Sequence, residues 1–356
     1  MGDPFPDEYL TALLGRPLCH IPTEAAEGKI RGGRVLVTGA GGSVGSALVR
    51  ALAGLHPERI IAIDSHEASL FRLGRDTLPA APIELRLADI RNQAKLTRIF
   101  VETRPNLVFH LAAYKHVPLG EQEPDEPVSV NVLGTEALLQ AASEAGVQEV
   151  VYPSSDKAVN PPSIYGATKR LAEALLDFHA GKADTPSIHV VRYVNVIGSS
   201  GSVIESFFAQ ARAGQPLTIT DQAMTRYWMA MSEAIAVLWH AIGLPSGSKT
   251  VLDTGVPVAV REMAARVSRL VSGADATPDL IFTGARPGER LAEELSSATE
   301  TLVRVAGDPV LRIEQSGWDQ LKPRVPSMIK EVRELLAMAT NAALRARVME
   351  MAHQLQ

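Results

Sequence analysis

A glycine-rich segment near the start of the chain constrains the fold more than any other feature of the sequence. It reads TGAGGSVG over Thr38–Gly45, between the apolar run RVLV and the amphipathic run SALVRALA. Its glycines permit a tight turn, close approach of a pyrophosphate to the backbone, and close packing of the following helix on the strand. The pattern therefore predicts a strand, a turn and a helix that together bind a dinucleotide.

The residues expected to bind this cofactor continue beyond the glycine-rich segment. Asp64 ends the next apolar run, where its carboxylate can accept hydrogen bonds from ribose hydroxyls and repel a 2′-phosphate, which favours NAD over NADP. Alternatively, the glycines only form a turn and Asp64 only caps the next helix. The full set of expected cofactor residues is Thr38, Gly39, Gly42, Ser43, Val44, Gly45, Asp64, Asp89, Ile90, Ala112, Ala113, Tyr165 and Lys169.

Short apolar runs alternate with longer amphipathic runs from Arg34 onward. The apolar runs predict six strands, RVLVTG, RIIAIDS, IELRLADI, LVFHLAA, EVVYPSS and SIHVVRYV. The amphipathic stretches between them, such as 128–145 and 163–180, predict crossover helices. This alternation is typical of an α/β fold with a Rossmann-like, doubly wound parallel sheet.

The texture of the sequence changes after about Asn195, where glycines and prolines separate shorter elements. The final segment has apolar residues at helical spacing, which predicts either packing helices or an oligomer contact. We therefore expect an N-terminal arm with a weak helix at 8–14, an NAD-binding Rossmann domain, a mainly substrate-binding lobe and C-terminal helices. These four parts cover residues 1–30, 31–195, 196–315 and 316–356.

Composition excludes several classes of function. The chain has 356 residues with 35 basic and 40 acidic side chains and a formal net charge of −5, and it has no basic run with interleaved aromatics, so nucleic-acid binding is not expected. A single cysteine and nine scattered histidines predict neither an internal disulfide nor a metal site. No apolar run approaches the ~20 residues of a membrane span, and the N-terminus lacks a signal-peptide pattern, so a cytoplasmic location is expected.

The segment YPSSDKAVNPPSIYGATK, residues 152–169, concentrates polar and titratable side chains. Tyr165 and Lys169 lie one turn apart on a predicted helix, and a lysine beside a phenol lowers the tyrosine pKa, which makes it a usable general base. Ser155, at the end of the preceding strand, can bind the same substrate oxygen. A surface pair is the alternative for the bare Tyr-x-x-x-Lys pattern.

Taken together, these segments resemble the extended short-chain dehydrogenase/reductases, and among them the soluble form of the nucleotide-sugar 4,6-dehydratases of the polysaccharide-biosynthesis type. The best-known members of that group act on UDP-N-acetylglucosamine. The resemblance runs in order over most of 34–311. It is carried by VLVTGAGGSVGS (35–46), HLAAYKHVPLGEQEP (110–124), NVLGTEALL (131–139), SSDKAVNP (154–161), YGATKRLAE (165–173), NVIGSSGSVIESF (195–207), LTITDQAMTRYWM (217–229) and ARPGERLAEEL (285–295).

The resemblance implies separate catalytic roles for the residues of this passage. Tyr165, with Ser155 and Lys169, removes the 4-hydroxyl proton while hydride leaves C4 for NAD. Lys157 then removes the C5 proton as a base while a protonated Asp156 donates to the leaving 6-hydroxyl, and hydride returns to C6. The alternative for the adjacent Asp156 and Lys157 is an incidental solvent-exposed ion pair, which contributes little.

The resemblance also implies contacts to a UDP-sugar. Arginines suit phosphate because they bind it with two parallel hydrogen bonds, although Arg226 could instead form an ion pair beside a helix. A homo-oligomer, dimeric or larger, is also implied, whereas retention or inversion at C5 stays open. The expected substrate residues are Lys115, His116, Asn131, Asn195, Ser202, Arg226, Arg286 and Glu289.

Departures from the pattern of the group leave the exact sugar open. Ser155 stands where Thr is common, Val194 where glycine is common, and Ala292 where an aromatic residue is frequent. Two other functions are compatible with the sequence. A UDP-hexosamine 4-epimerase would use Tyr165 and Lys169 but leave Asp156 and Lys157 without a role. A non-catalytic NAD-binding regulator would need none of these groups.

Overall fold

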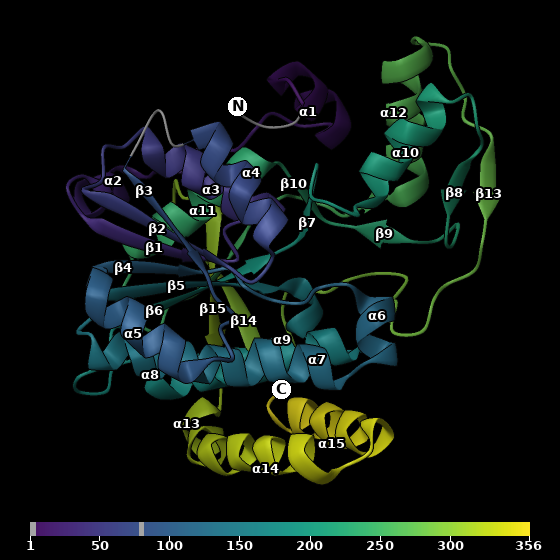
Figure 1. Ribbon diagram of the computed structural model, residues 1–356. Coiled ribbons are helices and arrows are strands. Elements are labelled where there is room, and N and C mark those ends of the chain that lie inside the picture. The colour runs from purple at the N-terminus through teal and green to yellow at the C-terminus, as the bar shows by residue number, and fades with distance from the viewer. Residues whose placement is uncertain (1–4, 78–81) are drawn as a thin grey trace.

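The six strands predicted from the apolar runs lie next to one another in a central, mostly parallel sheet. The structure is a computed structural model that describes residues 5–77 and 82–356, so residues 1–4 of the expected arm lie outside it. Within these residues the central sheet has the strand order β14-β15-β11-β6-β5-β4-β1-β2-β3 (Figure 1). The predicted strands are β1 (Arg34–Thr38), β2 (Arg59–Asp64), β3 (Ile83–Leu87), β4 (Leu107–His110), β5 (Glu149–Ser155) and β6 (Ser187–Tyr193). All neighbours from β3 to β11 run parallel, which confirms the doubly wound Rossmann-like class.

Helices cover both faces of this sheet, so its central strands are buried on both sides and are almost continuously apolar. One face carries α3 (Ser43–Ala53), α4 (Glu67–Thr77) and α11 (Met231–Ile242). The other face carries α5 (Gln93–Thr103), α8 (Gly134–Glu144) and α9 (Ile164–His179). Across the described residues we find no helix with the length and apolar character that a membrane crossing requires.

Three further strands extend the sheet beyond the six that the sequence predicts. They are β11 (Lys249–Leu252), which is parallel to β6, and the antiparallel pair β14 (Glu300–Arg304) and β15 (Val310–Gln315). All three come from the segment 196–315, which we expected to form mainly a separate lobe. The strand β11 follows the helix α11 as a crossover unit does, whereas β14 and β15 form an antiparallel pair with a short connection and no helix between them.

The remainder of that segment forms a smaller lobe with its own core (Figure 1). Phe207 and Met263 lie in this core together with Leu10 and Leu13 of the N-terminal helix α1 (Asp7–Leu14). The expected arm is therefore largely helical, and α2 (Glu24–Ile30) packs on α11. The lobe contains α10 (Val203–Arg212), β8 (Leu217–Ile219), β9 (Thr225–Arg226), β12 (Val258–Ala259), α12 (Val260–Ser272) and β13 (Leu280–Phe282). The short strands β7 (Asn195–Val196) and β10 (Trp228–Met229) pair where the chain passes between sheet and lobe.

The C-terminal segment folds as helices that pack within the same chain. They are α13 (Trp318–Leu321), α14 (Val325–Met338) and α15 (Asn341–Gln354). Ile329, Val348 and Met351 share one core with Leu171 and Leu175 of α9. Figure 1 shows α14 and α15 as a layer below α9. These helices therefore pack against the helix α9 of the same chain.

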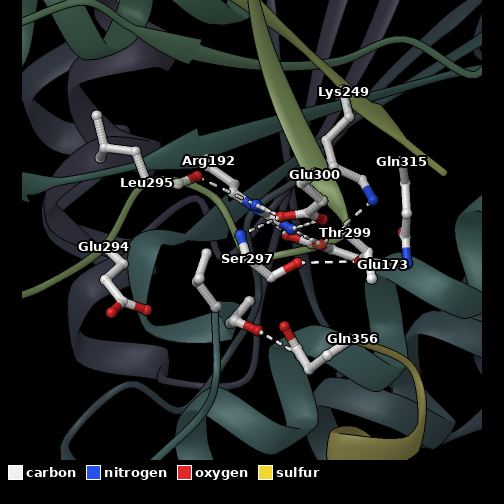
Figure 2. A network of polar contacts seen from close by, with 12 residues as sticks. Glu173, Arg192, Lys249, Glu294, Leu295, Ser297, Thr299, Glu300, Gln315 and Gln356 are labelled. Carbon is white, nitrogen blue, oxygen red and sulfur yellow. Dashed lines mark hydrogen bonds and ion pairs between the residues drawn. The ribbon is translucent and has the colours of Figure 1, made fainter.

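A buried network of charges ties α9 to the sheet (Figure 2). Arg192 of β6 lies 2.7 Å from Glu173 of α9 and 2.7 Å from Glu300 of β14, and Arg170 of α9 lies 2.8 Å from Glu300. Lys249 of β11 approaches Glu173 at 3.5 Å. Burial alone would raise the pKa of Glu173, but Arg192 and Lys249 outweigh burial and hold that pKa far below its usual range. Glu173 is therefore ionised inside the network, and its charge depends on its basic partners.

Removing one member should destabilise the fold strongly. We expect Glu173→Ala to lower the free energy of unfolding by about 3–5 kcal/mol. The substitution removes the carboxylate that Arg192 and Lys249 share, and Glu300 and Asp177 then compensate these buried charges only in part. Glu334→Ala is the matched control, since Glu334 forms only an exposed pair with Lys330 on α14 and should change the stability by less than about 0.5 kcal/mol. Urea unfolding followed by circular dichroism measures both, and equal losses would contradict the assignment.

Candidate active site

The turn between β1 and α3 accepts only glycine at two positions. Gly39 has φ +66°, and a Cβ there would lie 2.7 Å from the amide nitrogen of Ala112. A Cβ at Gly45 would lie 2.1 Å from the carbonyl oxygen of Gly39. The following helix begins at Ser43, and no side chain caps its first turn. This turn is therefore a cradle in which backbone amides at a helix N-terminus can meet an anion such as a pyrophosphate.

Asp64 lies beside this cradle at the end of β2. Its Oδ2 accepts a hydrogen bond from the Gly41 amide at 2.8 Å, and its Oδ1 accepts one from the His66 amide at 2.8 Å. The carboxylate thus stabilises the glycine turn. It also caps the turn before α4, and this capping is the role that the alternative interpretation gave to Asp64. Each oxygen keeps a further lone pair for a ribose hydroxyl.

The other expected cofactor residues line the same edge of the sheet. The Thr38 hydroxyl accepts from the Ala112 amide at 3.2 Å and contacts His110 at 2.8 Å, which joins β1 to β4. Asp89 forms an ion pair with Arg91 at 2.7 Å, and this hydrogen bonding lowers the pKa of Asp89. Ile90 is buried against Gly134. Ala113 follows Ala112 in the loop after β4.

The predicted catalytic passage runs from β5 into α9. Ser155 ends β5, the 3-10 turn η2 (Asp156–Ala158) follows, and Ser163 caps α9 by accepting from the Gly166 amide at 3.2 Å. A Cβ at Gly166 would lie 2.1 Å from the carbonyl oxygen of Lys157. Because glycine has no side chain, α9 can pack directly against the turn that carries Lys157.

Tyr165 and Lys169 lie one turn apart on α9, as predicted, but their surroundings differ from the prediction. The Lys169 ammonium donates to the Tyr152 hydroxyl at 3.0 Å and to the Pro153 carbonyl at 2.9 Å. Burial lowers the pKa of Lys169 to about 7. Burial also raises the pKa of Tyr165, while Lys157 and a hydrogen bond to Ser155 oppose that rise. The expectation that Lys169 lowers the tyrosine pKa is therefore not met, because burial raises this pKa and the cation that opposes the rise is Lys157.

Asp156 and Lys157 form a buried pair within a larger charge cluster. Lys157 Nζ lies 3.0 Å from Asp156 Oδ1 and 3.4 Å from Glu293 Oε1, and Glu293 lies 3.6 Å from Arg226 Nε. The Asp156 side chain is 0% exposed and the Lys157 side chain is 21% exposed, so this pair differs from an ion pair in open solvent. Asp156 Oδ2 and Glu293 Oε2 are buried without a hydrogen-bond partner among the described residues. Buried carboxyl oxygens are normally satisfied, so these two indicate where a ligand or a proton can bind.

The charge of Lys157 is set by its two carboxylate neighbours. Burial disfavours the ammonium, but Asp156 and Glu293 outweigh burial and raise the pKa of Lys157 above its usual value. Glu293 was not among the residues predicted from the sequence. In ARPGERLAEEL it stands beside Glu294, which is exposed and pairs with Arg290. No local pattern distinguishes the buried glutamate from its exposed neighbour.

Lys115, His116 and Asn131 meet around the loop that follows β4. Asn131 sits buried on the π-helical turn η1 (Ser129–Leu133), where its amide binds both backbone groups of Tyr114 at 2.9 Å and the Thr168 hydroxyl at 3.0 Å. Its polar atoms thus hold the loop against α9. Lys115 donates to the Ser200 carbonyl at 3.0 Å, and His116 packs on Gly201.

Loop 198–201 also touches the glycine turn. The Ser43 hydroxyl lies 2.9 Å from the Ser200 hydroxyl and accepts from the Ser200 amide at 2.9 Å. Ser202, next along the chain, caps α10 by accepting from the Glu205 amide at 3.4 Å. The loop that leads into the smaller lobe is therefore hydrogen-bonded to the turn where the cofactor is proposed to bind.

The remaining expected substrate residues fall into two groups. Asn195 Oδ1 lies 3.5 Å from Lys157 Nζ, inside the charge cluster. Arg226 also belongs to the cluster, and it donates to the carbonyls of Arg290 and Leu291 at 2.9 and 3.2 Å, so it anchors the loop that carries Glu293. Arg286 is exposed on the same loop, and Glu289 accepts from its amide at 3.0 Å.

The parallel sheet, the glycine cradle and the passage from Ser155 to Lys169 define an extended short-chain dehydrogenase/reductase. Within that class the chain belongs to the polysaccharide biosynthesis protein family, whose model matches residues 35–315.

Curated relatives agree with this assignment. The chain is 38% identical over 81% of its length to the "Probable polysaccharide biosynthesis protein EpsC" of Bacillus subtilis (strain 168) and covers 49% of that protein, so it spans about half the length of this relative. It is 29% identical to a "UDP-N-acetylglucosamine 4,6-dehydratase (inverting)" of Campylobacter jejuni, covering 75% of this chain and 78% of the relative. It is 30% identical to a "UDP-glucose 4-epimerase" of Rickettsia rickettsii, with the same coverage.

Solved structures share the fold. The UDP-glucose 4-epimerase of Thermus thermophilus in complex with NAD matches with a TM-score of 0.63 at 24% identity, over 74% of this chain and 90% of that chain. At this identity the match concerns the arrangement of the elements. The named relatives include both a dehydratase and an epimerase that act on UDP-sugars.

The two lysines of the passage should titrate differently. In nuclear magnetic resonance of ε-¹³C-labelled protein, we expect Lys169 to titrate near pH 7 and Lys157 to stay protonated over the same range. Because the folded pKa of Lys169 lies below its ordinary value of 10.5, the unfolded chain binds more protons between these values, and this group makes stability rise with pH from about 7 to 10.5. Lys169→Met assigns the signal, and a Lys169 titration near pH 10.5 would contradict the burial argument.

Proposed function

We propose that this protein is a nucleotide-sugar 4,6-dehydratase that converts UDP-N-acetylglucosamine to a UDP-4-keto-6-deoxy-hexosamine. The observation that supports this most strongly is the buried Asp156–Lys157 pair, 3.0 Å apart, directly after Ser155. Oxidation and reduction at one carbon need only a general base such as Tyr165. Elimination of water across C5 and C6 also needs a base for the C5 proton and an acid for the leaving hydroxyl.

The glycine cradle, the open N-terminus of α3 and the Asp64 carboxylate fit NAD. When bound, NAD accepts hydride from C4 of the sugar and returns it to C6. Asp64 would repel the 2′-phosphate of NADP, which favours NAD. The substrate residues proposed for the UDP-sugar are those of the charge cluster and the adjoining loops, with Arg286 and Glu289 at the exposed side.

Asp156 and Lys157 can provide both groups for elimination through one proton transfer. In this pair, the neighbouring carboxylates keep the proton on Lys157 by raising its pKa. Transfer of that proton across 3.0 Å produces a neutral amine and a carboxylic acid. Lys157 then removes the C5 proton, Asp156 donates its proton to the 6-hydroxyl, and water leaves. Elimination thereby restores the ion pair that the structure contains.

Ser155 connects this pair to Tyr165. Over the full cycle Tyr165 gains the 4-hydroxyl proton, Lys157 returns a proton to C5, and Asp156 has lost one to water. Resetting the site therefore requires one proton to pass from Tyr165 to Asp156. The Ser155 hydroxyl donates to Asp156 Oδ1 at 3.0 Å and hydrogen-bonds Tyr165, so it bridges the two groups.

A UDP-hexosamine 4-epimerase is the second candidate, since a relative of 30% identity is named a UDP-glucose 4-epimerase. That reaction returns hydride to C4 and gives the buried Asp156–Lys157 pair no role. A non-catalytic NAD-binding regulator, the third candidate, would have no use for the pair or for Tyr165.

Incubation with UDP-N-acetylglucosamine distinguishes these functions. We expect a product lighter by one molecule of water, measured by mass spectrometry, with no net consumption of added NAD. A product of unchanged mass would indicate the epimerase. Binding of NAD without turnover on a panel of UDP-hexosamines would indicate the regulator.

The Asp156→Asn variant separates the two chemistries. Loss of the acid should slow elimination by about 10²–10⁴-fold, while oxidation at C4, followed by the absorbance of the reduced nicotinamide, persists. Asp319→Asn, on the exposed surface of α13, serves as the matched control and should leave both steps unchanged. Equal loss of both steps in Asp156→Asn would show that Asp156 is not the acid of the elimination.

A further inference from the structure

The residues at the end of α15 contact the backbone of the catalytic passage. The Gln356 side chain accepts from the Asn160 amide at 3.1 Å and donates to the Ala158 carbonyl at 3.3 Å. These two backbone groups belong to the turn that begins with Asp156 and Lys157. One side-chain amide therefore satisfies both a donor and an acceptor of a turn that is otherwise buried.

Asn160 needs this support because of its backbone conformation. Its φ of +40° lies in the left-handed region, which a residue other than glycine adopts at some cost unless its surroundings hold it. Gln356 holds its amide, and Arg290 donates to its carbonyl. The path of the chain after Lys157 is thus fixed by two side chains from distant segments.

Two more contacts join α15 to the same passage. The Leu355 carbonyl accepts from Arg170, one residue after Lys169, and from Gln315 at 3.0 Å, which links it to the buried charges drawn in Figure 2. Arg345 lies 2.7 Å from Glu121, whose other oxygen accepts from the Ile164 amide at 2.7 Å, next to Tyr165. The segment therefore touches the passage near Lys157, near Tyr165 and near Lys169.

We propose that Gln356, which follows the helix α15, is the positioning residue for the Asp156–Lys157 pair. The inference rests on the proposed function only for its catalytic consequence. The geometric part stands on the contacts alone. Because proton transfer between the two groups requires their present separation, a loosened turn should impair elimination more than it impairs substrate binding.

The Gln356→Ala variant tests both parts. Amide hydrogen exchange should become about tenfold faster at Asn160, because one hydrogen bond to its amide is lost. The kcat of water elimination should fall by about tenfold, while KM changes by less than about twofold, since misplacing a reacting group by about 1 Å can cost up to about 100-fold. Gln354→Ala is the matched control, because this glutamine contacts only Glu350 and Arg324 among the described residues and should change neither quantity.

The outcomes separate this proposal from the proposed function. Unchanged exchange at Asn160 in Gln356→Ala would overturn the positioning role whatever the enzyme does. Faster exchange with an unchanged kcat would also overturn it, because loosening the turn would then have no effect on catalysis. If the wild-type protein releases no water from any UDP-hexosamine, the proposed function fails, and faster exchange in the variant still supports the geometric part.

Discussion

The contact between α9 and the turn after β5 is the constraint on which the site depends. No side chain fits at Gly166, so the helix rests on the carbonyl of Lys157, and a lengthened contact would separate Tyr165 from Ser155 and Asp156. The same face of the helix is held farther along, because Arg170 and Glu173 follow Gly166 by one and two turns. Arg170 and Glu173 are bound there to Arg192 and Glu300, and α14 and α15 cover the apolar face. The catalytic passage is therefore held between a buried charge network and a sheet edge.

The same kind of side chain has opposite properties at two places in this passage. Lys169 is buried beside a phenol and a carbonyl, which cannot compensate its charge fully, so its pKa falls. Lys157 is buried between two carboxylates, so its pKa rises. Local charge and not residue type decides which lysine is ready to lose a proton. The role proposed for Lys157 rests instead on its contact with Asp156, a group that can take its proton and return it.

Much of the fold was predictable because strong periodic signals determine it. The apolar runs from Arg34 to Val194 identified six strands, and the glycine spacing identified the first turn. The strands β11, β14 and β15 were not predictable in the same way, because β11 joins β6 and β15 through pairings that are distant in sequence. Within the site, local motifs placed Ser155 through Lys169 correctly along the chain. Glu293 and Gln356 were missed because their importance comes from a loop and a helix that return to the site only in three dimensions.

The bond between Ser43 and Ser200 bears on how the proposed cofactor is used over many reaction cycles. It attaches the entrance of the smaller lobe to the turn where the dinucleotide would lie. A dehydrogenase that releases reduced cofactor must open such a connection in every cycle. In a reaction that returns to the sugar the same hydride that it removed, the dinucleotide is in the same oxidation state at the end of each cycle as at its start. It can then stay in place as a permanent part of the catalyst, and a connection that slows its exchange does not slow the enzyme.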